Sequence, residues 1–422
     1  MPAIEMTTAE VPGVYRRFAS AVGTKNWQAA VSRQEDAIRS NHFLGDYLHS
    51  EYAIAYQLDE LRSLVARFGT VPHEACNDPN IFPSLAFAAQ VLKVLDSSTP
   101  SQAKTFVKRV QTAFSDSQNM HGLRLELQAA THFVSRGYRV ALHRKKNEGT
   151  FDLLIEDLGP SGLEVECKSI SENKGRRIHR RDALDFWGEL WSDVAGLAQN
   201  LRFGLAVVLT VPYRLPTAKE ERTALAREVV ARILAGTGAI LGGGAEVRIK
   251  TFDHETLEVA KNRGPENLRK AIDVATGTAN RDAVLYGTPA GGMLAFVMRS
   301  AVEDDVLNQV FSTLDDSAAR QFTQTRGALF WVALQGIDAN QLVSVHEHDI
   351  GPGEQPTALK RGVSDFLTNA PAHIIGVVFC SKSSLVPAVG DSKNLGGATN
   401  FFMKEESPLW HTSFRAPLKA AG

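Results

Sequence analysis

The segment 162–169, Gly-Leu-Glu-Val-Glu-Cys-Lys-Ser, constrains the fold of this 422-residue chain more than any other. Apolar and ionisable residues alternate along it, as in a β-strand, because successive side chains of a strand point to opposite faces. Its Leu, Val and Cys therefore share one face, and Glu164, Glu166 and Lys168 share the other. Three ionisable side chains on one face indicate either a solvated surface or a site with chemistry.

A second strand is predicted just upstream, at residues 151–157. It begins Phe-Asp-Leu-Leu-Ile, so a single carboxylate, Asp152, lies among apolar residues. The turn sequence Gly-Pro-Ser-Gly at 159–162 joins this strand to the first one, which places Asp152 and Glu166 on adjacent strands. Two carboxylates so placed can share one hard divalent cation, and Lys168 projects from the same face as Glu166. An amine there suits a group that orients water or contacts phosphate.

The surrounding pattern predicts the order αβββαβ. A helix is expected at 122–136, strands at 138–143, 151–157 and 163–170, a helix at 182–197 and a buried strand at 203–211. Glu126 is the only acid of the first helix and lies on its apolar stripe. A buried carboxylate is costly unless it is paired or bound to a metal, so Glu126 joins the candidate site.

Asp152, followed by Glu166-Cys167-Lys168 on this αβββαβ background, resembles the PD-(D/E)xK nuclease superfamily, which has the restriction-endonuclease-like fold. The resemblance implies that Asp152 and Glu166 bind Mg²⁺ or Mn²⁺, that Cys167 adds its main-chain carbonyl, and that Lys168 positions water. Glu126 matches the helical Glu of many members. The chain has Phe151 where the motif has Pro, and the resemblance covers residues 122–211 only.

The activity that this resemblance implies is divalent-metal-dependent phosphodiester hydrolysis by an endonuclease, with DNA as the expected substrate and defence or DNA processing as the context. Alternatives remain open: an RNA-directed nuclease, or a non-catalytic nucleic-acid-binding or assembly module that keeps the fold. A plain surface ion pair between Glu166 and Lys168 does not account for Asp152 or Glu126. Glu164 is expected to be solvated, or less often an auxiliary ligand. A homodimer is compatible with the family.

A basic segment directly follows the strand that carries Glu166 and Lys168. Residues 172–181, Glu-Asn-Lys-Gly-Arg-Arg-Ile-His-Arg-Arg, carry five Lys and Arg against one acid and lead into the next predicted helix. Because the formal net charge of the chain is −1, a nucleic-acid partner requires such a local patch. The predicted phosphate contacts are Lys174, Arg176, Arg177, Arg180 and Arg181. His-Arg-Lys-Lys at 143–146 is a second candidate.

The length of 422 residues predicts more than one structural unit, since single cores stop growing near about 250–300 residues. We expect a helical region at 1–118, the nuclease-like core at 119–215, and an α/β region at 216–422 that either extends the core sheet or forms its own domain. In that last region a Thr-Ala-Lys-Glu capping box at 217–220 is expected to open a helix. Further strands are predicted at 246–252, 283–286, 294–298, 329–334, 342–346 and 374–379, and helices at 306–320 and 357–367.

Other features argue against other protein classes. The three cysteines are widely separated, which disfavours a disulfide framework or a cysteine-based zinc site. The chain starts without a basic-then-apolar leader and has no run approaching the about 18 apolar residues of a membrane span, so a cytoplasmic location without membrane association is expected. His346-Glu347-His348-Asp349 is interpreted as a strand end in preference to a zinc site.

Overall fold

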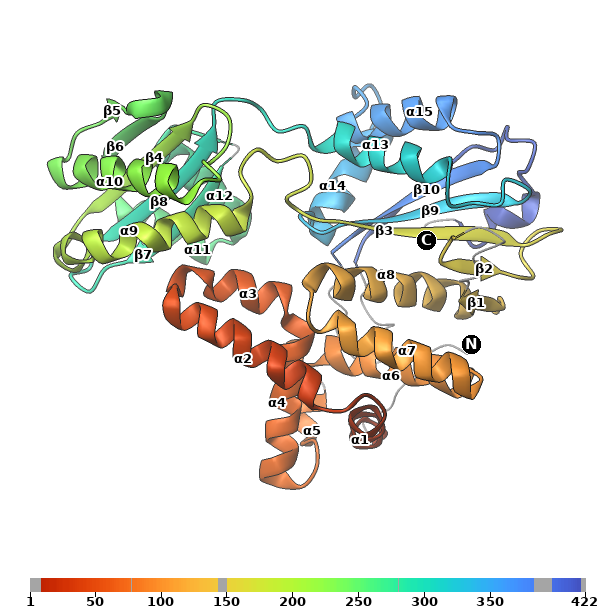
Figure 1. Cartoon of the computed structure of the whole chain (residues 1–422). Coiled ribbons are helices and arrows are strands. Elements are labelled where there is room, and N and C mark those ends of the chain that lie inside the picture. Colours follow the sequence, from red (N-terminus) through yellow and green to blue (C-terminus); the bar gives the residue numbers. More distant parts are fainter. Residues whose placement is uncertain (1–8, 77, 143–149, 280, 383–396, 419–422) are drawn as a thin grey trace. The chain divides into compact units, whose positions relative to one another are not determined.

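The computed structural model describes residues 9–76, 78–142, 150–279, 281–382 and 397–418 (Figure 1). They form a mixed α/β protein with two sheets, as the sequence predicted at the level of class. The chain divides into two compact units. Unit 1 comprises Met1–Gln34, His49–Lys174 and Val306–Gly422, and unit 2 comprises Glu35–Leu48 and Gly175–Asp305.

The N-terminal part is built from helices, and their ends follow ordinary capping chemistry. Thr99 and Gln102 form a capping box that starts α7, and the Asp116 side chain accepts from the Gln118 amide to start α8. Phe18 and Trp27 stack in an apolar core to which α1, α2 and α4 to α8 contribute. The helices are α1 (Val11–Val22), α2 (Lys25–Ser40), α3 (Gly45–Glu51), α4 (Ala53–Phe68), α5 (His73–Cys76), α6 (Phe82–Asp96), α7 (Pro100–Ala113) and α8 (Ser117–Val134).

The sheet of unit 1 has the strand order β1-β2-β3-β9-β10-β11. β9 runs parallel to both β3 and β10, whereas the β1–β2, β2–β3 and β10–β11 pairs are antiparallel. Its strands are β1 (Val140–Leu142), β2 (Leu153–Ile155), β3 (Leu163–Ile170), β9 (Gly327–Leu334), β10 (Ile374–Ser381) and β11 (Thr399–Met403). The C-terminal strands thus extend the sheet that contains β3.

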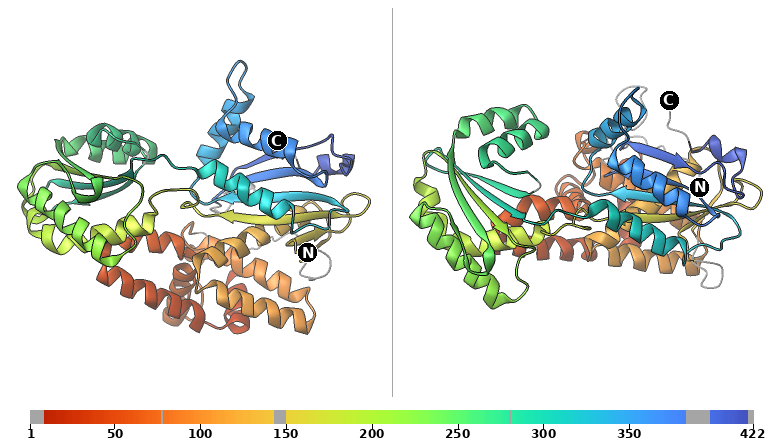
Figure 2. Two further views of the ribbon diagram at one scale, coloured as in Figure 1. Left: turned by 45° about the horizontal axis from the view of Figure 1, so that its top comes forward. Right: turned by 90° about the horizontal axis from the view of Figure 1, so that it is seen from above.

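Helices cover both faces of this sheet (Figures 1 and 2). α8 packs against one face through an apolar cluster that includes Leu125, Phe133 and Val165. The other face is covered by α13 (Val306–Ala318), α14 (Ala339–Ile350) and α15 (Ala358–Asn369), around a cluster that includes Val310 and Phe330.

The sheet of unit 2 has the order β5-β6-β4-β8-β7, in which β4 and β8 are parallel neighbours. α9 packs on α10 and contributes Trp187, which stacks on Phe296 of β8. The elements are α9 (Arg180–Asn200), β4 (Gly204–Val211), α10 (Lys219–Ala235), β5 (Ala239–Ile240), β6 (Glu246–Phe252), α11 (His254–Asn262), α12 (Pro265–Thr276), β7 (Asp282–Gly287) and β8 (Met293–Ser300).

The predicted core at 119–215 is wrong in its second half. The helix predicted at 182–197 and the strand predicted at 203–211 are α9 and β4, which belong to unit 2 and to the second sheet. The parallel neighbour of β3 is β9, so all of unit 2 from Gly175 to Asp305 lies between β3 and α13 in the chain. β4 and β9 are both apolar and almost wholly buried, so local periodicity could not identify the partner of β3.

Two smaller expectations are also wrong. Residues 342–346, predicted as a strand, lie inside α14, which Asp338 and Gln341 start with a capping box. The capping box predicted at 217–220 does not form, because Ala218 is the N-cap residue of α10 and provides no side-chain hydrogen bond. Among the residues that the structure describes, we found no helix with the length and apolar character needed to cross a membrane.

The packing of α15 on α13 makes a prediction about one glycine. A Cβ added at Gly362 would lie 2.3 Å from the Phe311 ring, so we expect Gly362→Ala to destabilise unit 1 by about 1–3 kcal/mol. Gly122 in α8 has nothing within 4 Å of the same position, so Gly122→Ala is the matched control and should stabilise by about 0.5–1 kcal/mol. Thermal unfolding midpoints should therefore move in opposite directions, and equal shifts would contradict this packing.

Candidate active site

Pairing between β2 and β3 positions Asp152. The antiparallel register sets Leu153 opposite Val165, and the Asp152 amide donates to the Val165 carbonyl at 3.1 Å. Asp152 itself lies one residue before β2, where its Oδ2 accepts from the Cys167 amide at 2.9 Å. The Asp152 carboxylate is thereby attached to the part of β3 that carries Glu166 and Lys168.

The alternation predicted for β3 is confirmed. Leu163, Val165 and Cys167 pack in the apolar cluster under α8. Glu166 is only 4% exposed, and its Oε1 accepts from Lys168 Nζ at 2.7 Å. Its Oε2 is buried and has no hydrogen-bond partner among the described residues. Burial and the nearby acids raise the pKa of the Cys167 thiol well above its usual value, so this thiol is not a nucleophile.

Glu126 is buried on α8, as its apolar neighbours indicated, and it is paired. Arg109 of α7 binds it in a bidentate manner, with Nη1 donating to Oε2 at 2.5 Å and Nη2 donating to Oε1. The sequence analysis missed Arg109. No local pattern could identify it, because its role depends on how α7 packs against α8.

The electrostatics of the cluster show a surplus of negative charge. Burial, together with Glu126 and Glu166, raises the pKa of Asp152 to about 8, against the opposing effects of the Cys167 amide and Arg109. Burial and Glu126 also raise the pKa of Glu166, although Lys168 and a side-chain hydrogen bond with Asp152 oppose the shift. Two buried acids and the half-buried Asp152 therefore share two nearby cations, Arg109 and Lys168, and the carboxyl of Asp152 holds its proton near neutral pH.

These residues fit a hard divalent cation held by two carboxylates. Mg²⁺ commonly binds proteins through one or two carboxylates and retains several waters. Asp152 and Glu166 supply two, and the orphaned Oε2 of Glu166 and the raised pKa of Asp152 both indicate carboxylates short of positive charge. The described part of the chain contains no group of three His, Cys, Asp or Glu side chains arranged as a metal site. Arg109 binds both oxygens of Glu126, so Glu126 is not counted here among the ligands.

Glu164 differs from the expectation. It was expected to be solvated, but it is fully buried. Arg326 Nη1 donates to its Oε1 at 3.1 Å, and the Thr323 amide donates to Oε2 at 2.9 Å. These partners from the segment before β9 compensate the charge of Glu164, so it is a structural residue and not an auxiliary ligand.

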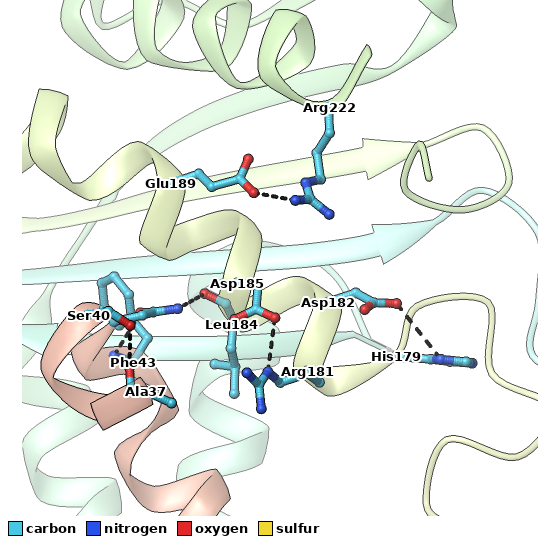
Figure 3. Close-up of polar contacts among 11 residues, drawn as sticks. Ala37, Ser40, Phe43, His179, Arg181, Asp182, Leu184, Asp185, Glu189 and Arg222 are labelled. Atoms are coloured by element: carbon cyan, nitrogen blue, oxygen red, sulfur yellow. Dashed lines mark hydrogen bonds and ion pairs between the residues drawn. The ribbon is translucent and has the colours of Figure 1, made fainter. Parts of the chain in front are cut away.

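The basic segment lies mostly in unit 2, whereas the acids of the site lie in unit 1. Lys174 is exposed and ends a part of unit 1. Arg177 Nη1 donates to the Tyr213 hydroxyl at 2.9 Å. Arg180 and Arg181 lie in the first turn of α9 instead of a loop, and they pair with Asp282 at 3.6 Å and Asp185 at 2.9 Å (Figure 3 shows the second pair).

The sequence also offered two weaker candidates, the basic residues 143–146 and the histidines at 346 and 348. The basic residues 143–146 lie outside the described residues. His346 and His348 lie on α14, where His348 Nε2 hydrogen-bonds the Gln355 carbonyl at 2.9 Å. That contact with the neighbouring loop is structural.

Comparison of the chain with protein-family profiles, with curated proteins and with solved structures found no match in any of the three.

Asp152→Asn tests the crowding of carboxylates. The folded protein holds the Asp152 proton up to a pKa of about 8, whereas the unfolded chain releases it near 3.8, so wild-type stability falls as pH rises between these values. Asn cannot ionise, so in EDTA its stability advantage should grow by up to about 1.4 kcal/mol per pH unit from pH ~4 to ~8. Urea unfolding at several pH values measures this. Asp96→Asn, at an exposed ion pair with Arg17, should show no such growth, and a pH-independent gap for Asp152→Asn would count against the cluster.

Arg109→Met should leave Glu126 buried without its cation, which we expect to cost about 3 kcal/mol. Because the uncompensated charge is the cause, adding Glu126→Leu to the same protein should recover most of the loss. A double-mutant cycle from urea unfolding measures the coupling. Two additive losses would show that Arg109 acts through packing alone.

Proposed function

We propose that this chain is a divalent-metal-dependent nuclease of the PD-(D/E)xK type. The observation that carries the proposal is the meeting of Asp152, Glu166 and Lys168 in one buried cluster of unit 1. Burying unneutralised carboxylates is costly, and structural roles elsewhere in this sheet are fully compensated, as at Glu164. A cation site explains why this cluster lacks such compensation.

The order of elements in unit 1 supports a restriction-endonuclease-like core. Without unit 2, the chain reads α8-β1-β2-β3-α13-β9, with β9 parallel to β3. This is the αβββαβ order on which the resemblance rests, with its fourth strand supplied from residues 327–334 instead of 203–211. In this proposal the part of unit 2 from Gly175 to Asp305 is an insertion between the third strand and the second helix of the core.

Each side chain has a distinct role in the proposed reaction. Asp152 and Glu166, with the main-chain carbonyl of Cys167, would hold Mg²⁺ or Mn²⁺. Such an ion, when bound, neutralises charge on the phosphate and makes water more acidic. Lys168 is held against Glu166 Oε1 at 2.7 Å, so its ammonium is fixed where it can orient water or stabilise charge on phosphate. Glu126 and Arg109 fix α8 against this cluster.

DNA is the proposed substrate, contacted by Lys174, Arg176, Arg177, Arg180 and Arg181, with DNA processing or defence as the context and a homodimer as one arrangement for cutting both strands. A second candidate is a nucleic-acid-binding module without catalysis. It is favoured by one observation: Glu126 is fully engaged by Arg109, and Lys168 already has an ion-pair partner. RNA is the alternative substrate.

Lys168→Ala separates the enzyme from the binding module. Lys168 is not a metal ligand in this proposal, so the variant should fold and bind nucleic acid but cut about 10²–10⁴-fold more slowly. The assay uses plasmid, linear duplex, single-stranded DNA and RNA with Mg²⁺, Mn²⁺ or EDTA. Lys104→Ala, the loss of an exposed lysine on α7, is the matched control and should cut like wild type.

The outcomes are distinct. Wild type that cuts while Lys168→Ala cuts equally fast would place the active site elsewhere. Wild type that cuts no substrate with either metal, yet binds nucleic acid, would establish the binding module instead.

A further inference from the structure

Unit 2 contains a cavity that the proposed active site does not use. Its volume is about 280 Å³, near the lower end of the range for small-molecule sites. It lies where β4 ends, between Tyr213 and Thr217 on one side and the residues leading into α9 on the other. β4 and β8 are parallel and Val211 pairs with Ser300, so the carboxyl ends of both strands meet at this edge. Ligands of open α/β sheets bind at such an edge.

The lining of the cavity is basic. Arg176, Arg177 and Arg214 contribute three guanidinium groups against one acid, Asp182. Asp182 Oδ2 lies 3.8 Å from Nδ1 of His179, so this carboxylate faces a side chain of the lining itself (Figure 3). The net charge of the lining therefore favours an anion.

Two helices begin at the same cavity. His179 is the N-cap residue of α9, and Thr217 immediately precedes Ala218, the N-cap residue of α10. Neither N-cap side chain bonds the amides of its own first turn. The partial positive charge of both helix ends adds to that of the three arginines.

The neighbouring cavity of unit 2 differs in charge from this one. A second cavity shares Arg176 and Ile178 with the first, and it is lined by Arg281. The Arg281 side chain is only 4% exposed and pairs with Asp273, but its Nε has no hydrogen-bond partner among the described residues. That Nε is closed off from solvent, and the second cavity is also lined by Asp282, Glu303 and Asp304, so the anion is assigned to the first cavity alone.

Tyr213 identifies the kind of anion. Tyr213 is 48% exposed, and the guanidinium of Arg177 lies 4.9 Å and that of Arg214 5.9 Å from its ring centroid. An exposed aromatic side chain beside cationic groups is the arrangement that single-stranded nucleic-acid sites use to stack a base. We propose that this cavity binds the phosphate of a nucleotide, with the base against Tyr213 and the phosphate on Arg176 and Arg214.

The nucleotide can be free or part of a strand, and the site extends the proposed function without requiring cleavage at Asp152 and Glu166. The test is equilibrium binding to the full chain in EDTA, so that nuclease activity does not enter. The probes are AMP, ATP, and a short single-stranded oligodeoxynucleotide with and without a 5′-phosphate. Arg214→Ala, at an exposed position, and Arg176→Ala should each weaken binding about tenfold or more, and Tyr213→Leu about tenfold.

Arg227→Ala is the matched control, because Arg227 is an exposed arginine of α10 that does not line the cavity. Its affinity should equal that of wild type, and Arg214→Lys should retain more affinity than Arg214→Ala. Arginine-dependent binding of AMP or ATP would identify a free nucleotide as ligand, and dependence seen only with an oligonucleotide would identify a strand. The proposal is overturned if no probe binds, or if Arg214→Ala and Arg227→Ala bind alike.

Discussion

The parallel pairing of β3 with β9 is the constraint on which unit 1 depends. It joins Leu163–Ile170 to Gly327–Leu334 in an unbroken eight-residue register, from Leu163 opposite Gly327 to Ile170 opposite Leu334. β3 contributes the acids and lysine of the site, and β9 connects it to β10 and the C-terminal helices. A parallel pair always requires a long crossover connection, and here that connection contains unit 2.

Two buried glutamates on one face of β3 show how burial distinguishes a structural acid from a candidate ligand. Glu164 receives an arginine, a backbone amide and a hydroxyl from the segment just before β9. Glu166, two residues later, receives Lys168 at one oxygen, and its other polar contact is with a second acid, Asp152, close to Glu126. The same residue type on the same face is thus fully compensated in one place and undercompensated in the other. Glu166 is therefore the buried carboxylate of β3 on which the proposed cation site rests.

Local sequence patterns predicted those features of the structure that depend only on residues close together in the chain. The alternation of β3, the turn that sets Asp152 beside β3, and the burial of Glu126 all follow from periodicity and a short connection. The strand that pairs with β3 could not be predicted in this way. β4 and β9 carry the same apolar pattern, and only tertiary packing selects between them. Arg109 and the compensation of Glu164 were missed for the same reason. In each case, the partner comes from an element whose position the local pattern does not determine.

The ends of unit 2 explain how so large a segment can interrupt the core. The Gly175 carbonyl accepts from the Asp305 amide at 2.8 Å, and the Arg177 amide donates to Asp304 Oδ1 at 2.8 Å. The insertion therefore leaves and returns at nearly one point, which is the condition under which an inserted unit leaves the host sheet intact. Arg176 and Arg177, which line the proposed nucleotide cavity, lie at the start of this inserted segment. They are within ten residues of Lys168 along the chain. The proposed cavity therefore includes the first residues of unit 2 after β3.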